Sequence, residues 1–475
     1  MRFRRTVYLW HRYLGIVLCL FIAMWFASGI VMMYVLYPSL DEHKRLSGLP
    51  KLESESVLPP SAILKEYPDA ETLRFNAVLG HPVYHVETNE ARYLLDARSG
   101  EVLQPGREAM VEAARRHSSA EIAKFEEISV DQWSVPERYN GHRPLTRVRM
   151  DDSKGTWLYL SSTTGEVVQE ATRFQRGWSW VGSVPHWIYP WQLRQHRDLW
   201  VQVVIWLSSF GLLLVISGTL VGFWRLRVLR RYKGNRMTPY RGWQRWHHLL
   251  GLTSVLFVFT FLVSGLFSMN PGKIFTSPPS DAEAGEAPPT WSDGALGDDA
   301  FATLDSLDLD GARELEWRRD AGRSILLLHH PDETRVRRAD GSPLTFDRSE
   351  LKRRANKLLP AADVVEATRL DDYDNYYYGR HKPKPLPVLR ILFDDPLETA
   401  LYINLENGAI ESRADQRKRW KRWLYNGLHS LDVPFLWERR PLWDVVVLSL
   451  MVIGLTFSLT GVVLGWRRLI CITRY

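Results

Sequence analysis

Four long apolar runs dominate the hydrophobic pattern of the chain, at residues 13–40, 199–224, 249–272 and 445–466. None contains Asp, Glu, Lys or Arg, and each is long enough to cross a hydrocarbon core of about 30 Å. They predict four transmembrane helices. The first run follows a basic start typical of a signal peptide, but it exceeds the roughly 7 to 15 apolar residues of a cleaved segment. We therefore expect a retained first helix.

Between these runs the pattern changes to that of strands. Apolar and polar residues alternate through 93–103, 157–168 and 400–410 and are interrupted by Gly-containing turns, which predicts β-hairpins with one buried face. Residues 107–116 and 349–357 are expected to form helices on those sheets. The stretch 278–298, rich in Pro, Gly, Ala and acids, is expected to be a surface loop.

The predicted fold class is an α+β membrane protein in two repeated halves. The expected transmembrane segments are 1–37, which includes the N-terminal arm, 199–224, 247–270 and 445–466. Two α+β domains are inserted at 38–198 and 271–444, with a basic link at 225–246 and a tail at 467–475. The two cysteines, Cys19 and Cys471, lie in or beside apolar runs, which excludes a disulfide framework and a Cys-rich metal site.

Basic residues predict the orientation. The arm through Arg12, the segment 225–245 and the tail after Trp466 together hold fifteen of the 61 Lys and Arg residues and no acid. By the positive-inside rule these segments are cytoplasmic and the two inserted domains lie outside. The sequence pI of about 9.2 therefore reflects membrane topology and does not indicate nucleic-acid binding.

An internal repeat relates the two halves. A shift of 236 residues aligns the first run with the third, including Trp10-His11 with Trp246-His247, Gly15 with Gly251 and Ser28-Gly29 with Ser264-Gly265. A shift of 243 aligns the second run with the fourth, and His186 with His429. Because each half has an even number of crossings, the copies share one orientation and are related by an axis along the membrane normal.

The repeated histidines are the candidate chemistry. A pseudo-twofold axis would bring His11 to face His247 at one membrane surface, and His186 to face His429 at the other. Two facing imidazoles suit the iron of a b-type haem, and the chain lacks the Cys-x-x-Cys-His of a covalent haem. Two haems, one near each surface, would carry electrons across the bilayer. The alternative for each histidine is an interfacial polar residue with no ligand role.

Neighbouring residues complete the predicted cofactor sites. Gly15 and Gly251 lie one helical turn from His11 and His247 and would leave space for a macrocycle, although small residues also simply permit helix packing. Arg12, Arg245 and Arg439, the repeat equivalent of His196, are candidate partners of haem propionates. His248 and His196 are also alternatives to the predicted ligands at the two surfaces.

A tyrosine-rich segment is the candidate substrate site. Tyr376, Tyr377, Tyr378 and Arg380 could stack on, and pair with the charge of, an anionic iron chelate. The equal alternative is a loop that docks the second inserted domain onto the membrane. No catalytic side chain is predicted, because the redox chemistry would belong to the haem.

The chain resembles the PepSY-associated transmembrane family, and in particular bacterial inner-membrane ferric-siderophore reductases. The resemblance rests on residues 10–15 and 246–251, the Gly-Glu-Val turns at Gly100 and Gly165, residues 373–378, Leu428-His429 and residues 461–466. It implies two periplasmic PepSY-like domains, the bacterial inner membrane and, for reductase members, two b haems that reduce a ferric chelate.

Two functions of different classes follow. The first is a haem-dependent transmembrane reductase of a periplasmic ferric-siderophore that releases Fe(II). No G-x-G-x-x-G or Walker sequence occurs, so the electron donor would be a separate cytoplasmic protein or a quinol. The alternative is a non-enzymatic membrane protein whose PepSY-like domains bind a peptide or partner protein in the periplasm.

Overall fold

The computed structural model describes residues 2–88, 91–277, 304–309, 311–320, 323–344, 346–380 and 383–472. It divides into two compact units. The bundle unit comprises residues 1–37, 177–277 and 416–475. The insertion unit comprises residues 38–176 and 278–415. The predicted loop at 278–298 lies outside the described residues.

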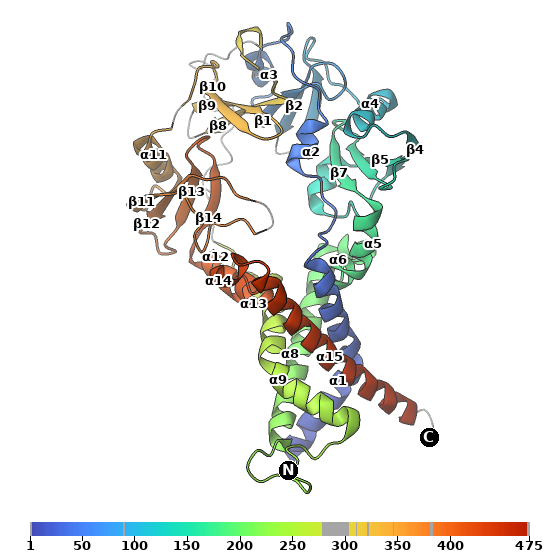
Figure 1. Ribbon diagram of the computed structural model, residues 1–475. Coiled ribbons are helices and arrows are strands. Elements are labelled where there is room, and N and C mark those ends of the chain that lie inside the picture. Colours follow the sequence, from blue (N-terminus) through green and yellow to red (C-terminus); the bar gives the residue numbers. More distant parts are fainter. Residues whose placement is uncertain are drawn as a thin grey trace. The chain divides into compact units, whose positions relative to one another are not determined.

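The bundle unit contains the four helices that are long and apolar enough to cross a membrane: α1 (Arg2–Met32), α8 (Arg197–Arg225), α9 (Gly242–Ser268) and α15 (Leu442–Ile472). This confirms the predicted four-helix architecture. Each helix contacts the next in the order α1, α8, α9, α15, and α15 contacts α1 (Figure 1). The helices α9 and α15 of the second half therefore repeat the arrangement of α1 and α8 around the bundle, as the internal repeat requires. Large apolar side chains such as Leu20 and Leu256 remain exposed on its surface, as expected for lipid-facing positions.

Short helices return the chain to the bundle in both halves. The first half uses α6 (Ser183–His186) and α7 (Trp191–Arg194), and α5 (Arg173–Val181) spans the boundary between units. The second half uses α12 (Gln416–Lys421), the π-helix η4 (Arg422–Gly427), α13 (Leu428–Ser430) and α14 (Pro434–Trp437). Residues 177–198 and 416–444, which the hydrophobic pattern places in the inserted domains, thus pack with the transmembrane helices.

The insertion unit contains three antiparallel sheets within the described residues. The first has the order β10-β9-β8-β1-β2-β3, the second β4-β5-β6-β7 and the third β11-β12-β13-β14. The strands of the first half are β1 (Ala70–Asn76), β2 (Val83–Thr88), β3 (Arg92–Asp96), β4 (Ile122–Ile128), β5 (Leu145–Met150), β6 (Trp157–Ser161) and β7 (Val167–Ala171). Those of the second are β8 (Glu314–Asp320), β9 (Arg323–His329), β10 (Thr334–Arg338), β11 (Val364–Leu370), β12 (Val388–Phe393), β13 (Ala400–Asn404) and β14 (Ile410–Ala414).

Helices of the insertion unit agree closely with the pattern of the sequence. The segments expected at 107–116 and 349–357 form α4 (Arg107–His117) and α11 (Arg348–Leu358), which bury Met110 and Leu351. The shorter α2 (Glu42–Ser47), α3 (Pro60–Glu66) and the 3-10 helix η1 (Glu137–His142) precede or link strands. The hairpins expected at 157–168 and 400–410 form β6–β7 and β13–β14, whereas that at 93–103 is reduced to β3 and one isolated bridge.

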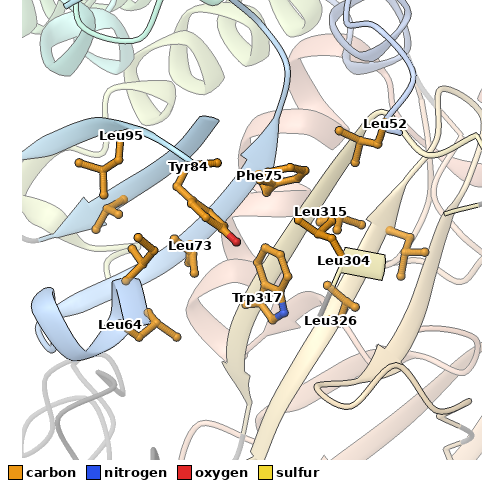
Figure 2. Packing of buried hydrophobic residues seen from close by; sticks show 14 of the residues in the cluster. Leu52, Leu64, Leu73, Phe75, Tyr84, Leu95, Leu304, Leu315, Trp317 and Leu326 are labelled. Carbon is orange, nitrogen blue, oxygen red and sulfur yellow. The ribbon is translucent and has the colours of Figure 1, made fainter. Parts of the chain in front are cut away.

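The two insertions share one sheet and one core. Strand β1 pairs antiparallel with β8, so that Leu73 lies opposite Trp317 at the centre of the six-stranded sheet. Figure 2 shows Phe75 and Tyr84 of the first half packed with Leu315 and Trp317 of the second. Trp317, Tyr84 and Leu73 are fully buried. Neither half could bury this core without the other, because each contributes only part of the apolar surface.

The four-stranded sheets preserve the repeat in detail. Strands β5 and β12 start 243 positions apart and have the same alternation of buried and half-buried residues. Beside the sheet β4-β5-β6-β7, Asp131 accepts hydrogen bonds from Arg147 and from the Tyr159 hydroxyl, both at 2.8 Å. Asp374, its repeat equivalent, accepts from the Tyr402 hydroxyl at 2.9 Å and from Arg390 at 3.5 Å. The shift found in the apolar runs therefore extends through the insertions.

A buried ionic cluster joins the first half to the second near the β1–β8 pair. The carboxylate of Glu314 accepts hydrogen bonds from Arg45, Arg74 and Asn76 at 2.8 to 3.2 Å. Glu166 accepts from Arg74 at 2.8 Å. Because two carboxylates meet two guanidinium groups, the charges balance inside the unit, which is the condition for burying them.

Candidate functional site

The bundle unit contains two histidine pairs, and the two imidazole rings of each pair are neighbours. The terminal-side pair, His11 of α1 and His247 of α9, lies at the end of the helices that carries the N-terminus and the basic link. Its ring centres are 6.2 Å apart and its ring planes differ by 36°. The insertion-side pair, His186 of α6 and His429 of α13, has ring centres 6.0 Å apart and planes that differ by 67°. The structure thus brings together both pairs that the repeat predicts.

Hydrogen bonds are compatible with the same tautomer in both imidazoles of the insertion-side pair. The Nδ1 of His186 lies 3.1 Å from the Ser28 hydroxyl, and the Nδ1 of His429 lies 3.0 Å from the Ser264 hydroxyl. Each hydroxyl donates its own proton to a carbonyl of its own helix, at Met24 and Phe261. The Nδ1 of His186 also lies 3.2 Å from the Trp25 carbonyl, which can only accept, so this imidazole donates from Nδ1 and keeps its lone pair on Nε2. The contact between His429 and Ser264 is compatible with the same tautomer.

The terminal-side pair follows the same rule with one difference. Thr460 donates to the carbonyl of Phe457 at 2.6 Å and accepts from the Nδ1 of His247 at 2.9 Å. The Nδ1 of His11 donates at 3.3 Å to the carbonyl of Leu214, which can only accept. All four histidines are therefore compatible with one tautomer, in which Nε2 is the basic nitrogen of a neutral imidazole ligand, and the carbonyl contacts of His11 and His186 require it.

A hydroxyl–glycine dipeptide accompanies every one of these histidines. The dipeptides are Ser217-Gly218 for His11, Thr460-Gly461 for His247, Ser28-Gly29 for His186 and Ser264-Gly265 for His429. An added Cβ would lie 2.6, 3.5, 3.4 and 3.7 Å, respectively, from the Cε1 of the histidine. At three of the histidines the hydroxyl forms a hydrogen bond with the ring. At His11, the ring and the Ser217 hydroxyl share the Leu214 carbonyl as acceptor. The glycine, which has no side chain, leaves space for the ring. Sequence reasoning noted the repeated dipeptides but missed this role.

Each pair lines a cavity. The terminal-side cavity has a volume of about 340 Å³ and includes Gly15, Gly251 and Arg12 among its lining residues. The insertion-side cavity has a volume of about 360 Å³ and is walled largely by apolar and aromatic side chains. These volumes lie within the usual range of ligand sites. Ile22 and Val258 line both cavities.

The other predicted cofactor residues have different placements. Gly15 and Gly251 face the terminal-side cavity, where an added Cβ would approach Leu214 and Phe457, not a histidine. Arg12 is exposed at the mouth of this cavity, and Arg468, which the sequence did not single out, also lines it. Arg245 is exposed and is absent from the lining.

The two alternative histidines differ from the four paired ones. His248 is buried and uses both ring nitrogens, Nδ1 with the Thr238 hydroxyl at 2.8 Å and Nε2 with the Gly222 carbonyl at 2.9 Å. His196 is an exposed residue immediately before α8. The geometry therefore gives no reason to exchange either for a member of the two pairs.

The predicted substrate segment belongs to the core and turns of the third sheet. Tyr377 is fully buried, stacks on Tyr402 at 5.0 Å and donates its hydroxyl proton to the Pro385 carbonyl, so it is closed to any substrate. Tyr376, Tyr378 and Arg380 are half-buried. Backbone amides of Tyr376 and Tyr377 bind Asp374. The tyrosine-rich motif thus serves largely to build the sheet.

The separation of the paired ring centres matches that of two imidazoles that bind one metal ion. A bond of about 2 Å from a metal to each imidazole nitrogen, with about 1 Å more to each ring centre, separates the centres by about 6 Å. Among the described residues no cluster of three or more His, Cys, Asp or Glu side chains could hold a metal. Two protein ligands suffice where a macrocycle supplies the remaining donors, as in haem.

Comparisons with known proteins address the chain as a whole. Residues 8–468 match the PepSY-associated TM region, which covers all four helices and both insertions. Curated proteins provide no match.

Proposed function

We propose, from the premise that this chain belongs to the PepSY-associated transmembrane family, that it is a di-haem reductase of ferric-siderophores. It would pass electrons across the bacterial inner membrane to a periplasmic chelate and release Fe(II). The supporting observation is the duplicated pair of facing imidazoles, one pair at each end of the bundle, all four compatible with one tautomer.

The residues around each pair fit a b-type haem. The four histidines would hold the iron through Nε2, and Arg12 and Arg468 at the terminal-side cavity would pair with propionates. Bound there, haem supplies one-electron chemistry at its iron. Iron would bind the neutral form of each imidazole.

The wall between the cavities supports electron transfer along the bundle. Ile22 and Val258, which line both cavities, are equivalent positions of the repeat and are 7% and 2% exposed. The two sites are therefore separated at this point by a pair of aliphatic side chains on the pseudo-twofold axis. No Asp or Glu is among the residues that line either cavity in the described part of the chain, so a carboxylate proton relay has no basis there.

Orientation and partners complete the proposal. The basic link and both termini would face the cytoplasm, where a separate protein or a quinol would donate electrons. The insertion unit would lie in the periplasm.

Absorption spectroscopy tests the proposal directly. Purified chain should show a haem spectrum that changes on reduction with dithionite, with two haems per chain. His247→Ala and His429→Ala should each lower the haem content by one, at opposite ends of the bundle. His196→Ala, an exposed histidine of the same unit, is the control and should retain both. Colourless, folded protein would overturn the proposal and favour the peptide-binding alternative.

A further inference from the structure

An aromatic wall closes one side of the insertion-side cavity. Trp187, Tyr189 and Trp200, all from the first half, line this cavity. Their rings form a continuous series, with centres 5.7 Å apart between Trp187 and Tyr189 and 5.6 Å apart between Tyr189 and Trp200. Tyr37 packs on both Trp187 and Tyr189. These four residues are called the aromatic wall below.

The wall connects the cavity with the surface. Tyr189 is 9% exposed, whereas the side chain of Trp187, which also lines the cavity, is 37% exposed. Other tryptophans of the bundle unit, such as Trp178 and Trp206, are more exposed and do not line the cavity, as expected for an interfacial belt. Trp187 therefore differs from the belt because it touches both the cavity and the outside.

The repeat shows that the scaffold does not require this wall. Trp200 donates to the Trp187 carbonyl at 2.9 Å, and its equivalent Trp443 donates to the Ser430 carbonyl at 2.9 Å. The structural bond is thus kept in both halves. The residues equivalent to Trp187 and Tyr189 are Ser430 and Asp432, so these two rings have no aromatic counterparts in the second half.

A cation lies on the wall. The guanidinium of Arg194 lies over the rings of Tyr189 and Trp200, at 5.4 and 4.9 Å from their centres. The equivalent residue in the second half is Trp437. A guanidinium stacked on aromatic faces holds its charge in a fixed position and attracts anionic groups.

We propose that the aromatic wall is the docking face for the chelate, and that it selects an anionic chelate with aromatic arms, of the catecholate class. A catecholate ring would stack on Trp187, and Arg194 would attract the negative charge of the complex. The inference rests on the proposed function. The reduction itself moves one electron from the reduced protein to Fe(III), which becomes Fe(II), and forms no bond to the protein. A cytoplasmic donor protein or quinol supplies that electron.

Binding of a redox-inert probe separates this inference from the proposed function. The Ga(III) complex of a tricatecholate has the charge and shape of the ferric complex but is not reduced. Titration calorimetry on the full chain in nanodiscs should show binding, weakened about tenfold or more by Trp187→Leu and by Arg194→Gln. Trp187→Phe should retain most of it. Trp178→Leu, an exposed tryptophan outside the wall, should leave it unchanged.

The outcomes are distinguishable. A haem-containing chain that binds the probe equally well in all variants, or that prefers an uncharged Ga(III) trihydroxamate, would overturn the docking face and leave the reductase intact. Binding that depends on Trp187 in a chain without haem would overturn the reductase and retain the docking face. Haem content should be unchanged in Trp187→Leu, which excludes collapse of the cavity as the cause of lost binding.

Discussion

The bundle unit and the insertion unit preserve the repeat to different degrees. In the bundle, each of the four histidines has a hydroxyl–glycine dipeptide beside it, in both halves. In the insertion unit, the sheets and the Asp131 and Asp374 hydrogen bonds are kept, but the ionic cluster is built once, because Glu166 is replaced by Ala409 in the second half. Features needed at both ends of the bundle are duplicated, and features needed once have diverged.

The same contrast applies within the bundle. The ligand geometry is duplicated, whereas the aromatic wall and Arg194 belong to the first half only. Under the proposed function, the symmetric features would hold the two haems, and the asymmetric features would distinguish one chelate from another. Three predictions test this comparison.

The largest effect is expected from glycines beside the terminal-side pair. In Gly218→Ala the new Cβ would lie 2.6 Å from the Cε1 of His11, which must displace the ring, whereas in Gly461→Ala the distance to His247 is 3.5 Å. Gly218→Ala should lose one haem per chain and lower the melting temperature, and Gly461→Ala should retain both haems. Equal haem contents in the two variants would contradict the assigned packing.

A smaller effect is expected from the hydroxyls that orient the histidines. Thr460→Val removes the acceptor of His247 and should weaken haem binding at that pair about 10–100-fold, the usual cost of losing a ligand's orienting partner. Ser28→Ala should cost less, because the Trp25 carbonyl lies 3.2 Å from the Nδ1 of His186 as a second acceptor. Haem titration of each apoprotein measures both. A greater loss in Ser28→Ala would reject the tautomer assignment.

The smallest effect is a pH dependence of the insertion unit. Burial lowers the pKa of His85 to about 4. Burial alone would raise the pKa of Glu314, but Arg74 and Arg45 outweigh it and lower the value to about 2. Both groups bind fewer protons when folded, so stability that is complete above about pH 6.5 should fall as the pH drops, first through His85 and then, below about pH 4.3, through Glu314.

Hydrogen exchange can localise this dependence. After correction for intrinsic rates, amides of β1, β2 and β8 should lose protection between pH 7 and pH 5, because His85 lies on β2 and Glu314 lies on β8. Glu314→Gln should lower protection at pH 7 and flatten the profile below about pH 4.3, because the ionic cluster loses one charge. The same pH profile in Glu314→Gln and in the unchanged chain would show that the ionic cluster does not control the response.

Much of the fold could be predicted from local patterns of apolar and polar residues in the sequence. Uncharged apolar runs identified the four helices, because a bilayer imposes length and composition on any segment that crosses it. The repeat then paired His11 with His247 and His186 with His429 by symmetry alone. Short-range alternation likewise placed β6, β7, β13 and β14.

Contacts between distant segments could not be predicted from the sequence. Tyr377 belongs to a polar, tyrosine-rich segment that is typical of a binding surface. It is nevertheless buried, and its ring stacks on Tyr402. The pairing of β1 with β8, which merges the two insertions into one core, joins strands more than 230 residues apart and leaves no local signal.

The sequence by itself determined the four membrane helices, the duplication and which histidines correspond, because these depend on composition and period. Only the tertiary structure decided the ring separations, the hydrogen bonds of each imidazole and the one-sided aromatic wall. Those properties depend on which backbone carbonyl, hydroxyl or ring from another helix meets each side chain, and that is fixed by packing in three dimensions.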